Sequence, residues 1–556
     1  MANEVIIRTE DIKDQDLLDL YAESSSERKL VEALTNKSPV LLIGSRGTGK
    51  TMLLRVAELK LDQNFSETRI IAIKVSFDKT LFINAYREPI LFRQWMLSKI
   101  LFSLKRKIQK LGLATQSKTF YKYFEINSNE DTLNGLDEFI NLLENSYRNK
   151  DIDVPSEIQK IFHVSSNAVN IINELDYFKA LIEDICNEYS VERIIILFDE
   201  ACHNFIPLQQ REFFTLFRDL RSPYITCKAA VYPGITSYGN TFQKFHDATI
   251  QKIDKDITDS EYVGWMRQIV KNQVEDTAYS ILESSGDNFN ALIYASSGNP
   301  RLLLKSLLAA SDGFRRLRTE DVNSTIKTFY RSDIWQEHTK LGEIYKGHKP
   351  LIDWGRIFID NNVLKDTEKK NSARIHAGTI KYQTIYFMIH KDAPEAVKIA
   401  VKILEYSGVI SLHSEGIKGT KSEIYDRYQI NLGILLSIEQ FPNRRYGEII
   451  TNLSIQNSYL TEYGMNSPAY SDAPNTSGTE IVDLQYVIKD ILEKDIEHLD
   501  LSPFQKNSLR KLNINSLADL LQTTEDHLTY ARYIGNKRAR QIYNIALSAA
   551  NEYISG

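Results

Sequence analysis

Hydrophobic residues along the chain form short, nearly continuous runs that alternate with amphipathic helical patterns. The runs predict strands at 39–43, 69–77, 192–199 and 227–232, and the helical patterns predict helices at 50–60, 86–110 and 207–220. A strand that is apolar on both faces is typical of a parallel sheet covered by helices. Strands that alternate with helices therefore predict an α/β domain with a parallel sheet.

The remainder of the chain is predicted to be mainly helical. Residues 393–432 read as a helix, a strand, a turn rich in glycine and lysine and a second strand, which is typical of a winged helix. Residues 463–480 are small, polar and punctuated by proline and glycine, as linkers are. We expect an α/β domain at 1–257 with a helical insertion at about 111–175, a helical lid at 258–345, a winged helix at 346–445, a linker at 446–480 and an all-α module at 481–556.

Length and composition agree with several domains of an ordinary globular protein. The 556 residues exceed what one hydrophobic core organises, about 250–300 residues. No apolar run reaches the ~20 residues of a membrane span, and the first residues lack the features of a signal peptide. Three unclustered cysteines, Cys186, Cys202 and Cys227, exclude a disulfide framework and a CxxC zinc site. We expect a cytoplasmic protein with no membrane partner, and its net charge of −5 means that any DNA contact must come from local basic patches.

A glycine-rich segment follows the first predicted strand and opens the first long helix. The residues predicted to bind nucleotide are Gly44, Ser45, Arg46, Gly47, Thr48, Gly49, Lys50 and Thr51. Glycines let backbone N–H groups turn toward phosphate oxygens, and the helix N-terminus adds positive potential. In this G-x-x-x-x-G-K-[ST] pattern, Lys50 is predicted to reach the β- and γ-phosphates and Thr51 to offer its hydroxyl to Mg²⁺. The alternative is a glycine turn that binds no ligand.

Two acids follow the third predicted strand. Asp199, at the end of the strand, would hold Mg²⁺ through water, and Glu200 would act as the general base on the attacking water. Acids at strand ends are often only solvated, but paired with the phosphate loop they predict an ATPase with ATP and Mg²⁺ as ligands. No NKxD motif reads guanine and no LSGGQ-type signature appears. His203 and Cys202 lie beside Glu200, but no second Cys/His pair stands at zinc-ligand spacing.

Several segments together resemble AAA+/STAND ATPases of the origin-recognition initiator type. They are the phosphate loop, the strand IIILFDE, the strand AAVYPG and the segment Ser297-Gly298-Asn299-Pro300-Arg301, and the resemblance spans residues 20 to about 440. It implies the AAA+ parallel sheet with a helical lid and a winged helix. It also implies that Arg301, opening a helix at 301–311, acts on the γ-phosphate, and that Tyr232 or Thr236 senses it. The alternative for Arg301 is a surface arginine at a helix start.

The chain departs from this family in two respects. The insertion at 111–175 lengthens the usual spacing between the phosphate loop and the acidic strand. No arginine finger can be assigned among Arg211, Arg218 and Arg221, so a fixed hexamer is not predicted and a homo-oligomer stays open. The resemblance to stand-alone initiator-like ATPases of prokaryotes implies work in mobile elements or antiviral defence, with an effector protein encoded elsewhere.

The C-terminal module contains two hairpin-like segments, 501–517 and 533–542. The second combines an apolar residue, a glycine and basic residues at a helix start, which is a pattern for phosphate contact. The module resembles helix-hairpin-helix domains, most closely the C-terminal domain of the RNA polymerase α subunit, over about residues 495–550. The residues predicted to contact DNA are Asn507, Gly535, Lys537, Arg538 and Arg540.

Two departures in this module weaken the expectation of sequence-specific reading. Phe504 stands where the main minor-groove arginine of that domain would be, and Asn536 replaces a lysine. Phosphate contact with double-stranded DNA of any sequence is therefore predicted. The alternative is a protein-docking or purely structural module.

Lysines of the predicted winged helix suggest a second DNA-facing surface. Lys398 and Lys402 lie on one helix, and Lys418 and Lys421 lie at the turn. The alternative is the ordinary solvated face of such a domain. The sequence thus predicts an ATP-driven switch that couples nucleotide state to DNA binding. The alternatives are a nucleotide-gated scaffold for protein partners and an initiator-like regulator of replication or transposition.

Overall fold

The computed structural model describes most of the chain. The described residues are 5–77, 89–113, 174–200, 207–234, 236–239, 241–344, 348–376, 382–474, 495–499, 501–521, 523–535 and short pieces of 118–156 and 538–546. The helical insertion predicted at 111–175 lies almost entirely outside them.

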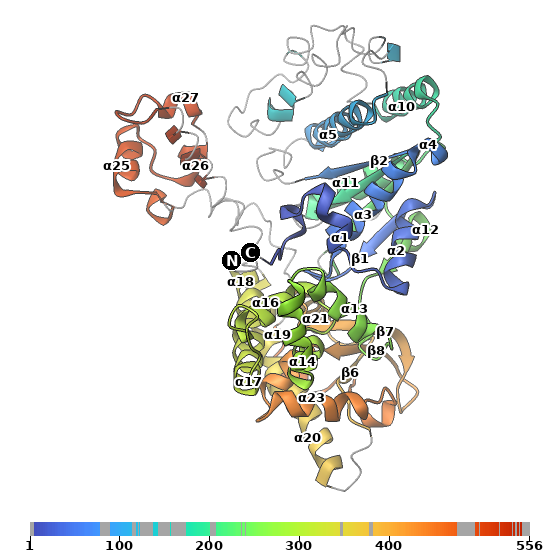
Figure 1. Cartoon of the computed structure of the whole chain (residues 1–556), viewed down its shortest axis with the longest axis vertical. Helices are drawn as coiled ribbons and strands as arrows, with labels where there is room; N and C mark the ends of the chain where they lie inside the picture. The colour runs from blue at the N-terminus through green and yellow to red at the C-terminus, as the bar shows by residue number, and fades with distance from the viewer. Residues whose placement is uncertain are drawn as a thin grey trace.

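The N-terminal half is built on one parallel sheet (Figure 1). Its strands are β1 (Val40–Ile43), β2 (Ile70–Ser76), β3 (Arg193–Asp199), β4 (Ile225–Val231) and β5 (Thr249–Lys252), in the order β2-β3-β4-β1-β5. Every neighbouring pair is parallel. The four strands predicted from apolar runs are confirmed. The fifth was missed because an edge strand that reads Thr-Ile-Gln-Lys, and is buried at no position, carries no apolar run.

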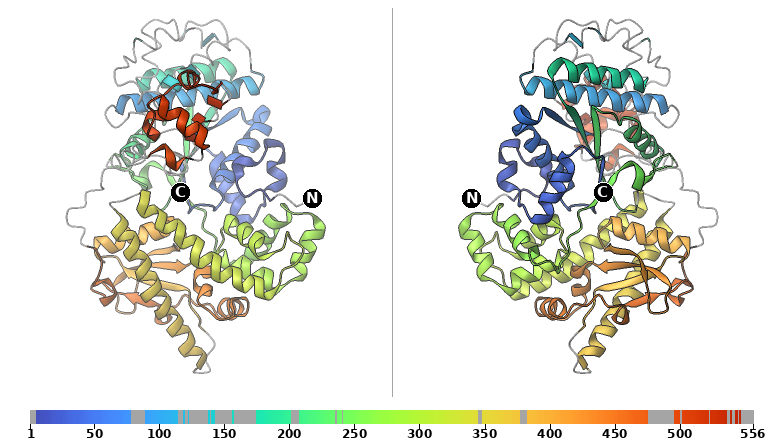
Figure 2. Two further views of the ribbon diagram at one scale, coloured as in Figure 1. Left: turned by 90° about the vertical axis from the view of Figure 1, so that its left-hand side faces the viewer. Right: turned by 90° about the vertical axis from the view of Figure 1, so that its right-hand side faces the viewer.

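Helices cover both faces of this sheet, as the continuous apolar strands require. One face packs on α2 (Ser25–Thr35) and α3 (Lys50–Gln63), and its core includes Leu42, Leu54 and Leu197. The other face packs on α5 (Pro89–Lys110), α10 (Leu175–Tyr189) and α11 (Pro207–Asp219). α5 and α10 lie side by side across the top of the sheet in Figures 1 and 2.

The segment before α2 is part of the fold. Ile12 and Leu17 are buried in the same core as α2 and α3. Arg55 of α3 fixes the segment, because its guanidinium donates to the carbonyl oxygen of Ile12 at 2.8 Å and to the carboxylate of Asp14 at 2.8 Å. The burial of Ile12 and Leu17 was not predicted, because polar residues occupy most of the other positions in this segment.

The described part of the lid predicted at 258–345 consists of helices joined by turns and short loops. Its helices are α13 (Tyr262–Lys271), α14 (Asp276–Ser284), α15 (Asp287–Ala295), α16 (Pro300–Ala310), α17 (Thr319–Thr328) and α18 (Ile334–Ile344). α16 begins with Pro300 after Asn299, whose side-chain oxygen accepts from the N–H of Leu302. This N-cap places Arg301 in the first turn of α16. The helix begins at Pro300, one residue before the predicted start at 301.

A second sheet follows the lid and contains the segment that was predicted to be a winged helix. Its elements are α19 (Lys349–Phe358), α20 (Leu364–His376), β6 (Tyr386–His390), α21 (Glu395–Tyr406), β7 (Ile410–Lys418), β8 (Ile424–Ile430), α22 (Leu432–Ser437), α23 (Pro442–Thr451) and β9 (Thr461–Tyr463). The strand order is β7-β8-β6-β9. The predicted helix, strand, turn and strand correspond to α21, β7 and β8. β6 and β9 were not predicted.

The linker predicted at 446–480 is wrong for residues 446–474. β9 pairs in parallel with β6, and Tyr463 and Tyr470 are buried. The rings of both tyrosines lie against Phe358 of α19, with ring centroids 5.1 and 6.0 Å apart. Small polar residues dominate the composition, but two tyrosines suffice to anchor the segment. The rest of the predicted linker lies outside the described residues.

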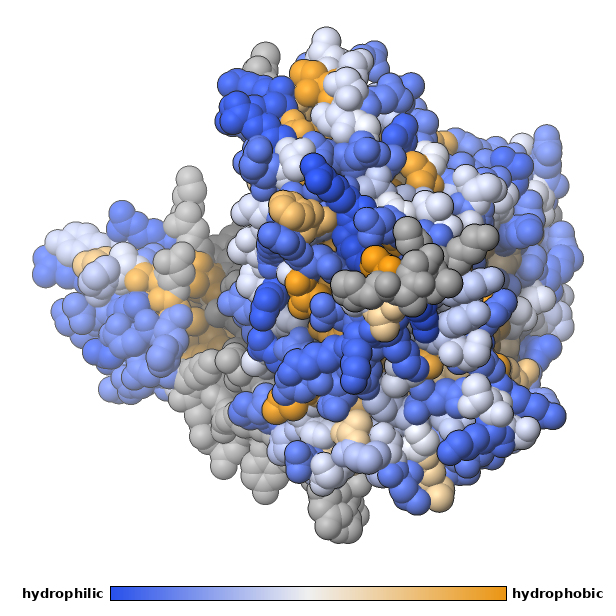
Figure 3. Space-filling view, turned by 90° about the horizontal axis from the view of Figure 1, so that it is seen from below, coloured by the Kyte–Doolittle hydropathy of each residue, from blue (hydrophilic) through white to orange (hydrophobic). Residues whose placement is uncertain are grey.

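The C-terminal module has a hydrophobic core of its own. Its described helices are α25 (Pro503–Lys511), α26 (Leu517–Leu521) and α27 (Glu525–Leu528), and residues such as Leu509, Leu520 and Ile542 fill its core. A capping box between Ser502 and Gln505 starts α25. Among the helices that the structure describes, none combines the length and hydropathy needed to cross a bilayer. The face seen in Figure 3 is mostly hydrophilic, with scattered apolar residues.

Candidate functional site

The phosphate loop connects β1 to α3 and turns sharply at two glycines. Gly47 and Gly49 have φ of 84° and 96°, a left-handed conformation that favours glycine. A Cβ on Gly47 would lie 2.8 Å from the side-chain oxygen of Asn299, so any larger residue would push the lid away from the loop. The hydroxyl of Thr48 donates to the carbonyl oxygen of Ser45 at 2.8 Å, which holds the loop closed.

Lys50 is buried beneath this loop. Its ammonium donates to the carbonyl oxygens of Gly44 and Ser45, both at 2.8 Å, and lies 3.9 Å from the centre of the Tyr232 ring. Burial lowers the pKa of Lys50 to about 7, against the opposing attraction of Asp199. A buried ammonium with carbonyl oxygens as its hydrogen-bond acceptors gains most from an anion, so the position fits a phosphate group.

The acidic side of the site meets the phosphate loop at Thr51. The hydroxyl of Thr51 lies 3.4 Å from Oδ1 of Asp199, and Lys74 lies 3.5 Å from Oδ2 of the same carboxylate. The structure therefore brings together the two predicted Mg²⁺ ligands. Mg²⁺ is usually held by one or two carboxylates together with phosphates and water, and a hydroxyl–carboxylate pair beside a phosphate loop fits it. Among the described residues, no larger His, Cys, Asp and Glu cluster fits a metal.

Glu200 lines the same cleft as the phosphate loop. Its φ is 58°, which is uncommon for a residue other than glycine, and its N–H donates to Oδ1 of Asp199 at 3.1 Å. A strained conformation at the end of a strand is a frequent property of functional sites. Cys202 and His203, considered above as metal ligands, lie outside the described residues.

Arginines complete the positive side of the cleft. Arg301 lines it from the first turn of α16, and its Nε is buried without a hydrogen-bond partner. Burial, and next the nearby charge of Arg46, lower the pKa of Arg301. Arg8 adds a third guanidinium to the lining. Together with Lys50 these side chains concentrate positive charge where a polyphosphate would neutralise it.

The cleft also contains residues that the sequence did not predict. Its volume is about 350 Å³, and the phosphate loop, the N-terminal segment and the lid all line it. The additional lining residues include Ile6, Ile7, Thr9, Tyr21, Trp265, Ile269 and Gln273. Ile6 donates its N–H to the side-chain oxygen of Gln273 at 3.1 Å, across 267 positions of the chain. No local motif predicts a contact between segments so far apart in the sequence. The apolar pair Ile6-Ile7 indicates only that this polar segment has residues to bury.

Replacing Arg301 by alanine is expected to reduce the preference for ATP over ADP. The guanidinium would contact the γ-phosphate, which ADP lacks, so ATP affinity should fall by about tenfold or more while ADP affinity changes little. Isothermal titration with each nucleotide measures the ATP affinity and the ADP affinity. Lys305→Ala serves as the control, because Lys305 lies on the same helix and pairs with Glu337 instead of lining the cleft. An equal loss for both nucleotides would show that Arg301 acts only through packing.

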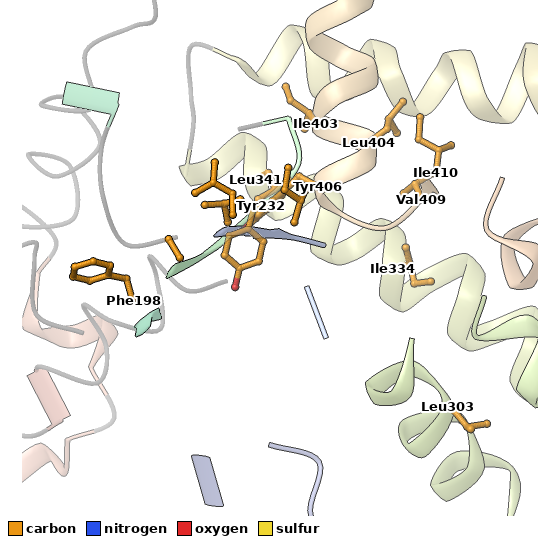
Figure 4. Close-up of a cluster of buried hydrophobic side chains, with 14 of the residues drawn as sticks. Phe198, Tyr232, Leu303, Ile334, Leu341, Ile403, Leu404, Tyr406, Val409 and Ile410 are labelled. Atoms are coloured by element: carbon orange, nitrogen blue, oxygen red, sulfur yellow. The ribbon is translucent and has the colours of Figure 1, made fainter. Parts of the chain in front are cut away.

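Tyr232 and Thr236 occupy different environments. Tyr232 lines the cleft, and its ring lies beneath Lys50 and against Tyr406 of α21, 5.5 Å between centroids (Figure 4). The hydroxyl of Thr236 donates to the carbonyl oxygen of Tyr232 at 2.6 Å and is not part of the cleft lining. Of the two predicted sensor residues, only Tyr232 is placed beside the phosphate loop.

The arginines considered as fingers are partly engaged within the chain. Arg211 donates to the hydroxyl of Ser237 at 3.2 Å. Arg218 donates to Asp219 and to the carbonyl oxygen of Thr241. These contacts fix α11 to the segment that follows β4.

The lysines predicted on the winged helix divide into two groups. Lys398 forms an ion pair with Glu395 at 2.7 Å. The backbone of Lys402 packs closely on the α/β domain, because a Cβ added to Gly234 would lie 2.2 Å from the carbonyl oxygen of Lys402. Part of the helix α21 therefore packs against the α/β domain. Lys418 and Lys421 are exposed at the turn between β7 and β8.

Predicted DNA-contacting residues of the C-terminal module lie at its surface where the structure describes them. Asn507, Gly535 and Arg538 are exposed. Lys537 and Arg540 lie outside the described residues. Two further basic side chains of the module are paired, because Lys506 and Arg510 lie 3.5 and 2.9 Å from Glu497. Arg532 and Arg538 are exposed and are available to phosphates.

Two known families match separate parts of the protein. The family ORC-CDC6-like matches residues 6–77, which contain the N-terminal segment, β1, the phosphate loop and α3. The C-terminal domain of the bacterial RNA polymerase alpha subunit matches residues 485–546. Both resemblances inferred from the sequence are confirmed over these segments. The structure combines an α/β fold on a five-stranded parallel sheet with a C-terminal helical module. No curated protein matches the sequence.

Solved structures of two ORC proteins are similar to the chain over a larger span. The ORC1 protein of Aeropyrum pernix in complex with DNA is 13% identical and covers 78% of this chain and 98% of its own, with a TM-score of 0.33. The ORC2 protein of the same organism, in ADPNP-ADP complexes, is 10% identical and covers 78% and 94%, with a TM-score of 0.31. Similarity this low carries no functional argument.

Proposed function

We propose that the protein binds and hydrolyses ATP and uses its nucleotide state to control binding to double-stranded DNA. The observation that carries the proposal is the cleft between the phosphate loop and the lid. It combines a buried lysine, three arginines, a hydroxyl–carboxylate pair and a strained glutamate. A polyphosphate with its metal is the ligand that satisfies all of these groups.

The residues of the cleft have distinct roles in the proposed hydrolysis. Lys50 and Arg301 would bind and orient the γ-phosphate, and Thr51 and Asp199 would hold Mg²⁺, which neutralises phosphate charge when bound. Glu200 would take a proton from water as the water oxygen bonds to the γ-phosphorus and the bond to the bridging oxygen breaks. The products are ADP and phosphate.

Contacts around the phosphate loop support coupling to the winged helix. Asn299 of the lid donates to the carbonyl oxygen of Arg46 at 2.8 Å, while neighbouring Ser297 accepts from the N–H of Leu432 at 2.7 Å. One short lid segment thus bonds both to the phosphate loop and to the start of α22. Leu432 directly follows β8 of the winged helix, so a shift of the lid on binding ATP would be transmitted to that domain.

A second contact links the cleft to α21. Tyr232 lies between Lys50 and Tyr406, which is the last residue of α21. In Figure 4, Tyr232, Tyr406 and Leu341 of the lid lie together. When a phosphate draws the ammonium of Lys50 away from Gly44 and Ser45, the surroundings of the Tyr232 ring change, and α21 packs directly on that ring.

The C-terminal module is the proposed DNA contact. Changing Lys537, Arg538 and Arg540 together to alanine is expected to weaken duplex binding to a similar extent on unrelated sequences. Each lost phosphate contact should flatten the slope of log affinity against log salt by about 0.9. A salt titration of the full-length proteins on two unrelated duplexes measures this, with ATP affinity checked in parallel.

The matched control for this experiment is Arg510→Ala. Arg510 is a surface arginine of the same module, but it lies 3.6 Å from Asp495 and 2.9 Å from Glu497. It should therefore leave the salt slope unchanged. If the triple variant and the wild type bind DNA with equal affinity and slope, the module does not contact DNA, and a nucleotide-gated protein scaffold becomes the better account. These contacts give no support to a role in antiviral defence.

A further inference from the structure

Two aromatic rings lie exposed beside each other on the C-terminal module. Phe504, at the start of α25, is 47% exposed, and Tyr533 is 66% exposed. Their ring centroids are 6.5 Å apart, with the planes tilted by 53°. The module's apolar core is filled by other residues, so neither ring is needed to close it. Exposed rings gathered in one place are typical of a binding surface.

The backbone at Tyr533 adopts an uncommon conformation. Its φ is 68°, a left-handed conformation that is rare for a bulky side chain. Arg538 stabilises this turn, because its guanidinium donates to the carbonyl oxygen of Tyr533 at 2.8 Å. A strained residue that is held in place by a neighbour and still presents its ring to solvent indicates a functional position.

Positive charge surrounds these rings. The guanidinium of Arg532 lies 5.1 Å from the centre of the Tyr533 ring, and Arg538 bonds to the same residue. From 529 to 551 the sequence contains four arginines and lysines and no aspartate or glutamate. Flat apolar faces beside cations complement a nucleic-acid strand, whose bases are flat and whose phosphates are negative.

The chemistry of the rings favours an unpaired strand over a duplex. A phenylalanine ring has no N–H or O–H group to donate to phosphates or to base edges in a groove. It can stack on the face of a base, but inside a duplex each base face is already covered by the next base pair. Only a single strand or an opened region presents free faces.

We propose that Phe504 and Tyr533 form a stacking surface for unpaired bases of a nucleic-acid strand, with Arg532 and Arg538 contacting the adjacent phosphates. This inference rests on the proposed function, because it uses the same DNA-binding module. It goes further in assigning that module a preference for single-stranded or locally opened DNA. A switch with such a surface would hold a region after its strands separate.

The test compares full-length proteins on a single strand of about 16 nucleotides and on the duplex of the same sequence, by fluorescence anisotropy. Phe504→Leu keeps an apolar side chain and removes the flat ring. Affinity for the single strand should fall about tenfold, since stacking on an aromatic ring is worth that order per base, while duplex affinity changes less than about twofold. Phe504→Tyr restores a ring and should restore single-strand binding.

A matched control is Phe441→Leu, which removes another exposed ring at the start of α23. It should leave both affinities unchanged. Binding to an RNA strand of the same sequence shows whether the surface prefers a DNA or an RNA backbone. If Phe504→Leu loses affinity for either single strand but not for the duplex, the inference is supported. Equal losses on single strand and duplex, or no loss on the single strand, overturn it.

The outcomes for the wild type separate this inference from the proposed function. If the wild type binds duplex and not single strands, the stacking surface is rejected and the proposed DNA-binding switch stands. If it binds neither, both are rejected.

Discussion

Replacing Lys50 by alanine is expected to abolish ATP binding at concentrations that saturate the wild type. Lys50 is the buried cation of the phosphate loop, and its ammonium is held against the loop carbonyl oxygens of Gly44 and Ser45. Hydrogen bonds to charged groups contribute about 1.5–3 kcal/mol each, so losing two of them from the β- and γ-phosphates should lower affinity by at least ~100-fold. Isothermal titration of both proteins with ATP measures the difference.

Two controls separate this effect from loss of folding. Lys60→Ala removes a lysine of the same helix that pairs with Glu23 outside the cleft lining, and it should bind ATP as the wild type does. Thermal unfolding of the Lys50→Ala variant should still show a cooperative transition, because the core under α3 is made by apolar residues. An ATP affinity like that of the wild type in Lys50→Ala would show that the nucleotide site has been assigned wrongly.

Replacing Glu200 by glutamine is expected to stop hydrolysis while leaving ATP bound. The amide keeps the size of the side chain but cannot accept the proton of the attacking water. General base catalysis typically contributes 10²–10⁴-fold, so steady-state phosphate release should fall by about that factor. ATP affinity should stay within about twofold, because binding depends on the cations of the cleft.

The control for Glu200 is Glu212→Gln. Glu212 lies on α11, pairs with Arg93 at 3.5 Å and does not line the cleft. Its substitution should leave phosphate release at the rate of the wild type. If Glu200→Gln releases phosphate as fast as the wild type, another group is the base.

The parts of the site that could be predicted from sequence are those encoded within a few residues. The phosphate loop and the Asp199-Glu200 pair follow apolar strands directly, so local patterns located them. Their meeting, with Thr51 3.4 Å from Asp199, followed from a parallel sheet whose strand ends share one edge. The start of α16 at Pro300 was similarly local, because proline and an asparagine N-cap both favour it.

The parts that could not be predicted depend on contacts between distant segments. Ile6 reaches Gln273 across the cleft, and Tyr232 reaches Tyr406, with no signal in either local sequence. The linker prediction failed for a different reason. Composition averaged over 463–480 is polar, but burial of Tyr463 and Tyr470 decides the structure of the described part. A few large rings can outweigh many small polar residues, because burial of each stabilises packing by about 1.5–3 kcal/mol.

The central claim, that nucleotide state controls DNA binding, is tested most directly by one comparison. Duplex affinity is measured with Glu200→Gln held in the ATP state and again with ADP, at the same salt concentration. Coupling between two sites is typically 1–3 kcal/mol, so we expect the two affinities to differ by about 5–150-fold. Equal duplex affinities in the ATP and ADP states would contradict the account.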